Sequence, residues 1–201
     1  MQSMVMPQPM PVREAAVSTR VTRPERDAAF ERLFDEFSAP IFNYVLRMVA
    51  DRDRAADITQ DTFIKAYRKL DSLADEGSRR SWLYRIATNT AIDEIRRRRF
   101  VTPMGNDERH AQRPDAGPGP EAQAMAGTLD GRVQRALLHL KANHRQCLLL
   151  SDVEDMSAQQ IGEVMGLSYG AVRTLLCRAR GEMRRHLAAE GFTRGTSTPT
   201  S

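Results

Sequence analysis

The sequence contains little cysteine and few aromatic residues. Its 201 residues include two cysteines and one tryptophan, and aromatic residues make up 6% of the chain. Cys147 and Cys177 lie far apart, with no Cys or His cluster at ligand spacing, so neither a disulfide framework nor a zinc site is expected. Both lie in apolar helical patterns, and we expect buried, reduced thiols.

Long apolar runs are also missing. None approaches the roughly 18 residues that a membrane-spanning helix needs. The first residues lack a basic segment followed by an apolar core, so no signal peptide is expected. Neither period-two alternation nor an internal repeat is present. These absences predict an all-α protein of the cytoplasm, without cofactor, metal ion or membrane insertion.

The net charge is modest but unevenly distributed. Thirty Lys and Arg oppose 26 Asp and Glu, a formal charge of +4, which alone does not indicate a polyanionic partner. Between Arg79 and Arg99, seven arginines oppose only two acidic residues, and four of the arginines are consecutive. A solvated helix face is a common explanation for a charge run, but this clustering favours phosphate contacts.

Hydrophobic periodicity predicts two small helical domains joined by a flexible linker. The first domain is expected over 26–100 and the second over 127–190. The intervening segment, 101–126, holds four Pro and three Gly without apolar periodicity, which is typical of a linker. Residues 1–25 and 191–201 also lack periodicity and are expected to be disordered.

Three interruptions are predicted in the first domain. Ser38 followed by Pro40 indicates a helix end and a restart, because Pro favours the first turn of a helix. Asp51–Arg54 is predicted as a polar turn, and 73–78 as a loop. A third helix should then run from about 81 to 100 with one buried stripe. Its members are Leu83, Ile86, Ala87, Thr90 and Ile95.

The second domain contains the pattern of a helix-turn-helix. Ser157 and Gln160 form a capping box at the start of a short helix, and Gly166 can end that helix in the left-handed conformation. Leu167 is expected to fill the core, and Ser168 to cap the next helix. An ordinary helical hairpin is commoner, but the caps, the turn and the basic outer face together favour a DNA reader.

On the second helix of this pair, four apolar residues should face inward: Val172, Leu176, Ala179 and Met183. The opposite face is then turned toward base edges and phosphates, as in a recognition helix. The predicted duplex-binding residues are Ser168, Tyr169, Gly170, Arg173, Thr174, Cys177 and Arg178. Leu175 lies between the two faces.

The third helix of the first domain is predicted to present a different kind of binding face. Trp and Arg side chains there can stack on unpaired bases, and Asn can bond a base edge, which suits single-stranded DNA. A lone Trp is more often a core anchor, and the adjacent arginines make the two explanations for Trp82 about equal. The predicted residues are Arg79, Arg80, Trp82, Arg85, Asn89, Asp93, Arg96 and Arg97.

The segment Ala55–Leu70 offers an acidic surface. Asp57 and Asp61 lie one turn apart, with Gln60 beside them and Phe63 nearby. A carboxylate pair can bind a metal ion, but no His or third acid lies at ligand spacing. A solvated helix face is the simplest interpretation, and a protein-docking patch is the more specific one.

Together these stretches resemble bacterial RNA polymerase sigma factors, specifically the small extracytoplasmic-function (ECF) group of the sigma-70 family. The resemblance covers most of 28–188, in the family's order. It is carried by ADITQDTFIKAYRKLDSL, SWLYRIATNTAIDEIRRRR and ALLHLKANHRQCLLLSDVEDMSAQQIGEVMGLSYGAVRTLLCRARGEM. It implies a region 2-like domain, a region 4-like domain and a binding protein without catalytic activity.

The resemblance also implies a role for each surface. The acidic patch with Phe63 would dock on the clamp-helix coiled coil of core RNA polymerase. The loop before the third helix and that helix's face, with Asn89 most prominent, would melt and read the −10 element. Arg173, Thr174 and Arg178 would read the −35 element as duplex DNA. An anti-sigma factor, released on stress, is expected as a further partner.

The chain departs from the family pattern at three places. Lys141, Ala142 and Asn143 replace a frequent Pro-Pro-Arg run. Gly162 stands where Ala is usual, at a helix-propensity cost of up to about 1 kcal/mol. Leu175 replaces a frequent Arg, so one −35 contact is in doubt and the promoter preference of relatives does not carry over.

Two other functions remain open. One is a stand-alone helix-turn-helix regulator whose N-terminal domain senses a ligand or dimerises, although the basic Trp/Arg/Asn face argues against it. The other is a metal-dependent nuclease that uses Asp57 and Asp61, which insensitivity to chelators would exclude.

Overall fold

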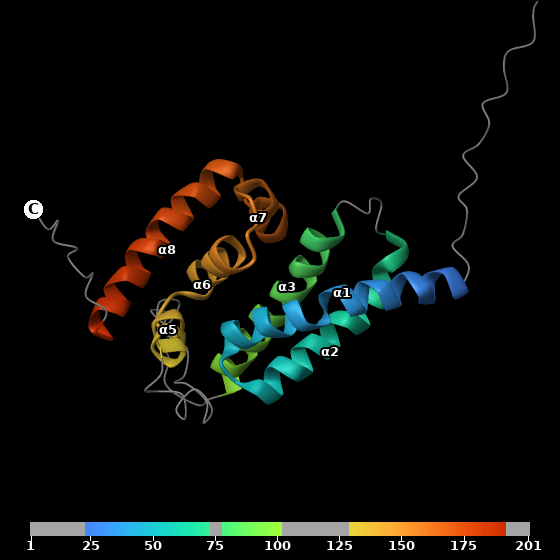
Figure 1. Cartoon of the computed structure of the whole chain (residues 1–201), viewed down its shortest axis with the longest axis horizontal. Coiled ribbons are helices and arrows are strands. Elements are labelled where there is room, and N and C mark those ends of the chain that lie inside the picture. Colours follow the sequence, from blue (N-terminus) through green and yellow to red (C-terminus); the bar gives the residue numbers. More distant parts are fainter. Residues whose placement is uncertain (1–22, 73–77, 102–128, 192–201) are drawn as a thin grey trace, which may run out of the picture.

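The computed structural model describes residues 23–72, 78–101 and 129–191, and regular structure in these ranges is entirely helical (Figure 1). The expected all-α class is therefore confirmed. Most of the predicted N-terminal extension, the linker and the C-terminal tail lie outside the described residues. None of the described helices is long and apolar enough to cross a membrane.

The N-terminal unit consists of α1 (Arg23–Val49), α2 (Arg52–Lys69) and α3 (Arg79–Val101), with a 3₁₀ turn, η1 (Leu70–Ser72), after α2. The three helices pack against one another (Figure 1). Their contact is lined by buried residues from each helix, among them Leu33, Ile41, Tyr44, Val45, Met48, Ile58, Leu83 and Ala87. A buried hydrogen bond of 2.8 Å joins the Tyr44 hydroxyl to the Thr88 hydroxyl.

Two predicted boundaries of α1 are wrong. The helix begins at Arg23, inside the segment expected to be disordered, with Pro24 and Glu25 in its first turn, where both residue types are favourable. It also continues through Pro40, where a break is predicted. Pro40 is exposed while the neighbouring Ile41 is fully buried, so packing of the apolar face outweighs the loss of one backbone hydrogen bond.

The predicted polar turn at Asp51–Arg54 is shorter in the structure. Ala50 takes a positive φ of 53°, and Asp51 is the N-cap of α2. The Asp51 carboxylate accepts a hydrogen bond of 3.1 Å from the Arg54 amide. Because this bond satisfies an otherwise unpaired amide of the first turn, the helix starts at Arg52 rather than at Ala55.

The C-terminal unit contains α5 (Leu129–Leu138), α6 (Ala142–Leu148), a π-helical turn η4 (Leu149–Val153), α7 (Ala158–Met165) and α8 (Tyr169–Ala189). The long helix α8 packs against α5, α6 and α7 (Figure 1). The apolar run at the end of α6 and the start of η4 is buried: Cys147, Leu148, Leu149 and Leu150.

The two units pack together and share one hydrophobic core. Helix α7 lies against α3, and α5 and α6 lie against α1 (Figure 1). Residues of α3 outside the predicted stripe, Tyr84 and Ala91, are buried as well. Nothing in the sequence indicates this packing, because residues 127–190 read as a separate domain on a tether.

A fully buried arginine joins the ends of two helices across the contact. The Arg145 guanidinium donates to the carbonyl oxygens of Leu137, Leu138 and Leu140, at 2.8, 2.9 and 3.3 Å, and to the carbonyl oxygen of Met48. These oxygens lie in or just beyond the last turns of α5 and α1. Carbonyls at helix C-termini have no partner within the helix, and they carry the negative end of the helix dipole.

We expect Arg145→Ala to lower the free energy of unfolding by at least about 3 kcal/mol, because several buried carbonyl oxygens lose their donor. Urea unfolding followed by circular dichroism measures the change. Arg185→Ala, an exposed arginine on α8, is the matched control and should change stability by less than about 0.5 kcal/mol. Equal midpoints for both variants would contradict the role given to Arg145.

Candidate nucleic-acid interfaces

The predicted helix-turn-helix is formed by α7 and α8, and its caps are confirmed. The Ser157 hydroxyl accepts from the Gln160 amide at 3.3 Å, while the Gln160 side chain accepts from the Ser157 amide at 2.9 Å. Gly166 ends α7 with a φ of 68°. The Ser168 hydroxyl accepts from the Ala171 amide at 3.3 Å and caps α8. The turn between the helices is therefore set by local hydrogen bonds.

The prediction that Leu167 fills the core is wrong. Its side chain is 38% exposed. Its backbone lies over α7 instead: the Leu167 amide donates to the Gly162 carbonyl at 3.0 Å, and the Leu167 carbonyl oxygen lies 2.6 Å from where a Cβ on Gly162 would stand. The glycine is thus required by this close approach, and its cost in helix propensity is secondary.

The register predicted for α8 is confirmed. The inward residues Val172, Leu176 and Ala179 are buried, and Met183 packs against the core. Each of the seven predicted outward residues is exposed: Ser168, Tyr169, Gly170, Arg173, Thr174, Cys177 and Arg178.

Local contacts order part of this outward face. The Arg173 guanidinium lies over the Tyr169 ring, 5.8 Å from its centroid, and the Thr174 hydroxyl donates to the Gly170 carbonyl at 3.0 Å. Leu175 is half-buried and packs against the core, so it takes no direct part in the outward surface.

The two cysteines differ in environment. Cys147 is buried as expected, and burial raises the pKa of its thiol to about 11. Cys177 is exposed on the outward face of α8. The expectation that both are buried is therefore wrong for Cys177, because the helical period places it opposite Val172 and Leu176.

A second exposed basic face runs along α3. The predicted residues from Arg85 onward are all exposed: Arg85, Asn89, Asp93, Arg96 and Arg97. Arg97 forms an ion pair of 3.2 Å with Glu94 one turn earlier. Trp82 is half-buried and packs against the core. Of the two explanations open for Trp82, core anchor or stacking platform for bases, the structure therefore supports the core anchor in part.

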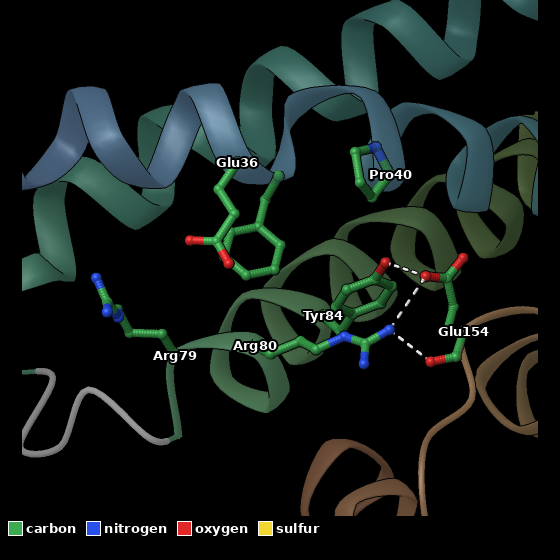
Figure 2. A pocket seen from close by; sticks show the side chains of 7 residues that line it. Glu36, Pro40, Arg79, Arg80, Tyr84 and Glu154 are labelled. Carbon is green, nitrogen blue, oxygen red and sulfur yellow. Dashed lines mark hydrogen bonds and ion pairs between the residues drawn. The ribbon is translucent and has the colours of Figure 1, made fainter.

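The two arginines at the start of α3 lie in a cleft between the two units. Figure 2 shows Arg79 and Arg80 in this cleft of about 460 Å³, with Glu36 and Pro40 of α1 on one wall and Glu154 on another. The Arg80 guanidinium donates to the Glu154 backbone carbonyl and lies 3.7 Å from its carboxylate. Arg80 is therefore held by the C-terminal unit in this conformation.

Two of the four predicted docking residues on α2, Gln60 and Phe63, line an apolar groove. Asp57, Gln60 and Asp61 are exposed, as predicted, whereas Phe63 is only 4% exposed and belongs to the core. Phe63 instead forms part of the floor of a groove of about 690 Å³ between α1 and α2. The other apolar residues of the groove are Phe30, Phe34, Phe42, Ala56, Ile64 and Tyr67.

Two large exposed apolar residues of this groove were not among the residues predicted from the sequence. Phe34 is 45% exposed and Ile64 is 41% exposed. The available signal was the spacing of Gln60 and Ile64, which places Ile64 one turn along the exposed side of α2. Among the described residues, Asp57 and Asp61 belong to no group of three or more potential metal ligands.

Two family models match the chain: "Sigma-70 region 2" over residues 33–101 and "Sigma-70, region 4" over residues 130–183. The ECF RNA polymerase sigma factor SigW of Bacillus subtilis is 30% identical over 175 residues, which cover 84% of this chain and 93% of SigW. The sigma factor YlaC of the same species is 33% identical over 161 residues, covering 79% and 92% of the two chains. The chain belongs to the ECF sigma factors of the sigma-70 family.

Two solved structures share the fold. RpoE in its complex with the anti-sigma factor NepR from Bartonella quintana superposes with a TM-score of 0.63 at 21% identity, covering 80% of this chain and 97% of RpoE. CnrH in complex with the cytosolic domain of CnrY gives a TM-score of 0.61 at 23% identity, covering 81% and 90%. The region 2 match covers most of α1 and all of α2 and α3, whereas the region 4 match extends from α5 into α8.

Sigma factors are initiation factors and not enzymes, so the nuclease hypothesis for Asp57 and Asp61 is excluded by the family. Each matched region contains one of the two basic faces: the α3 face lies in region 2 and the α8 face lies in region 4.

In this sigma factor we expect Gly162→Ala to destabilise region 4 by about 1–2 kcal/mol, because crowding against a backbone carbonyl outweighs the gain in helix propensity. Thermal unfolding measures the change. Gly181→Ala is the matched control: its Cβ enters open space within α8, and it should stabilise by about 0.5–1 kcal/mol. A Gly162→Ala protein as stable as the Gly181→Ala protein would contradict the steric argument.

Proposed function

We propose that this sigma factor binds core RNA polymerase and directs it to promoters by reading a −10 and a −35 element. The observation that carries the proposal is that one chain holds two unlike, exposed basic faces, on α3 and on α8. Two modules on one chain gain affinity from their high effective concentration, but only where both DNA sites have the right spacing. Action on the polymerase places the protein in the cytoplasm.

Region 4 is proposed to read the −35 element as duplex DNA. A capped helix with an exposed N-terminal half suits insertion into the major groove, where Arg173 and Arg178 can reach base edges or phosphates. Tyr169 supports this role because its ring lies beneath the Arg173 guanidinium and limits its motion.

The α3 face is proposed to capture the −10 element as single-stranded DNA. Arg85, Asn89 and Arg96 lie on one exposed side of a helix whose other sides are packed, so the backbone that carries them is fixed. Guanidinium planes stack on unpaired bases, and an Asn amide can bond a base edge. Strand separation costs a few kcal/mol, which capture of the unpaired bases offsets.

The α1–α2 groove is proposed as the docking surface for core polymerase. Exposed Phe34 and Ile64 supply an apolar centre, and Gln60 lines the same groove. Asp57 and Asp61 are exposed on the same helix, α2, on either side of Gln60 in the sequence. An apolar centre with a polar rim is the usual anatomy of a protein interface. Phe63, which is buried, then supports the groove residues by packing beneath them and does not itself contact the polymerase.

An anti-sigma factor is proposed as a further partner. The sigma factor RpoE, which shares the fold, has been solved in complex with the anti-sigma factor NepR. Co-purification from cells grown with and without stress tests the proposal. Absence of any stoichiometric partner under every condition would contradict it.

We expect run-off transcription with bacterial core polymerase on genomic fragments to show new start sites only when this protein is added. Those starts should share one pair of −10 and −35 sequences. Specific binding to duplex DNA without polymerase, together with no new start sites, would instead indicate the stand-alone regulator.

We expect Arg173→Ala and Asn89→Ala to impair different steps. If Arg173 contacts a base, Arg173→Ala should weaken holoenzyme binding to −35 duplex DNA by about 1–3 kcal/mol. If Arg173 contacts a phosphate, the slope of the logarithm of the affinity against the logarithm of the salt concentration should fall in magnitude by about 1. Asn89→Ala should spare duplex binding and reduce promoter opening, measured by permanganate reactivity. Arg185→Ala, at the far end of α8, is the control; identical defects in all three variants would contradict the assignment.

Replacing Ile64 with Ser should weaken binding of core polymerase about tenfold, because a side chain at an interface centre loses roughly 1–2 kcal/mol of apolar contact. Fluorescence anisotropy of the labelled protein measures the affinity. The control is Val153→Ser, an equally exposed apolar residue (46%) in the C-terminal unit. Equal affinities for both variants would place the docking surface elsewhere.

A further inference from the structure

We propose that the first turns of α8 select a thymine in the −35 duplex by packing against its 5-methyl group, at a site made by Tyr169, Gly170 and Thr174. The inference deepens the proposed function and rests on it, because it takes the outward face of α8 to be the duplex-binding surface. It adds the base that this surface selects and the kind of contact that selects it.

Gly170 is a glycine that its own fold does not require. It lies in the first turn of α8, outside the left-handed region of φ, and glycine at a regular helical position is less stable than alanine. Apart from its chain neighbours and the adjoining backbone of its helix, no heavy atom of the described residues lies within 4 Å of where a Cβ would stand. Gly162 differs, because a carbonyl oxygen occupies that space. A bound partner that comes close to the backbone accounts for a glycine at position 170.

The open space at Gly170 lies on the side of α8 that is accessible to DNA. Gly170 is exposed, as are Tyr169 and Thr174, and α8 runs along the outer side of the C-terminal unit (Figure 1). The missing side chain lets a base pair in the major groove come nearer to the helix than it could beside a larger residue. The atoms that this base pair meets are then those of the side chains next to the glycine.

Thr174 lies one turn beyond Gly170 and offers a methyl group to the DNA. Its hydroxyl donates to the Gly170 carbonyl at 3.0 Å, so its single hydroxyl proton is used within the helix. While that bond holds, the hydroxyl cannot donate to an acceptor on a base edge. The methyl group remains, and a threonine methyl is one of the usual apolar contacts of the thymine methyl group.

Tyr169 adds a flat apolar surface that is held in place. It is 58% exposed, and the Arg173 guanidinium lies 5.8 Å from the centroid of its ring, a cation–π contact that orders the ring. Cys177, one turn beyond Arg173, is exposed as well, and a thiol is a weak hydrogen-bonding group. The outward face of α8 therefore combines apolar atoms at Tyr169, Thr174 and Cys177 with the charge of Arg173.

Thymine fits this combination better than the other bases do. In the major groove thymine alone carries a methyl group, whereas cytosine presents an amino donor and the purines present N7 beside a carbonyl or an amino group. A polar base edge held against apolar atoms loses its bonds to water without replacement. The thymine methyl group instead gains apolar contact with the Thr174 methyl group and the Tyr169 ring, so the site favours thymine.

The first test removes one methyl group from the DNA and one from the protein. Binding of the holoenzyme is measured by fluorescence anisotropy on labelled −35 duplexes in which each thymine in turn is replaced with deoxyuridine. Deoxyuridine keeps every hydrogen-bonding group of thymine and lacks only the methyl group. Thr174→Ser is the matching change in the protein, because serine keeps the hydroxyl that donates to the Gly170 carbonyl.

We expect uracil at one position to weaken binding of the parent protein about fourfold, the equivalent of one buried methyl group. Thr174→Ser should bind the thymine duplex about fourfold more weakly than the parent does, and it should no longer distinguish thymine from uracil at that position. Specific binding with equal affinities for thymine and uracil at every position, or an undiminished preference in Thr174→Ser, would overturn this inference alone. Absence of any specific binding to −35 duplexes would contradict the proposed function as well.

The second test inserts a Cβ between α8 and the DNA. Gly170→Ala should raise the melting temperature of the free protein through helix propensity, yet weaken binding to the −35 duplex at least about tenfold, because the new methyl group crowds the base pair. Gly181→Ala is the matched control, since its Cβ also enters open space but lies about 16 Å further along α8. It should raise the melting temperature and leave the affinity unchanged. An affinity equal to that of the parent in Gly170→Ala would overturn the close approach that the site requires.

Discussion

The described fold depends on one buried cation. Arg145 brings the C-terminal ends of α1 and α5 to a single guanidinium, where helix dipoles and unpaired carbonyls make a positive charge favourable. Because Met48 belongs to region 2 and Leu137 to region 4, the same side chain that orders region 4 also attaches it to region 2. Gln134 adds a second bond of 2.9 Å to the Arg47 carbonyl at the same place.

The two contacts between the regions differ in chemistry. At the Arg145 end, a charge meets backbone dipoles that are satisfied only in the packed state. At the Glu154 end, an acid meets an arginine and a tyrosine that line a cleft of about 460 Å³. The interface thus has a fully buried contact at one end and a partly exposed contact at the other.

Local sequence signals predicted the surfaces better than they predicted single contacts. The outward face of α8 follows from its apolar period, and Cys177 is exposed for that reason despite an apolar neighbourhood. Phe63 and Leu167 both differ from expectation. Phe63, predicted to contact the polymerase, is buried, and Leu167, predicted to fill the core, is exposed. Both outcomes depend on backbone approach, of Leu167 over Gly162 and of α1 over α2, which periodicity does not encode.

The sequence by itself determined the helical class, the caps of α7 and α8, the register of the recognition helix and the family, because each rests on residues within a few turns of one another. Only the tertiary structure decided that α1 passes through Pro40, that Gly162 is required, and that Arg80 is bound to Glu154, 74 positions away in the chain. Contacts of that range depend on how complete helices pack. Packing sums many weak apolar interactions that no short motif contains.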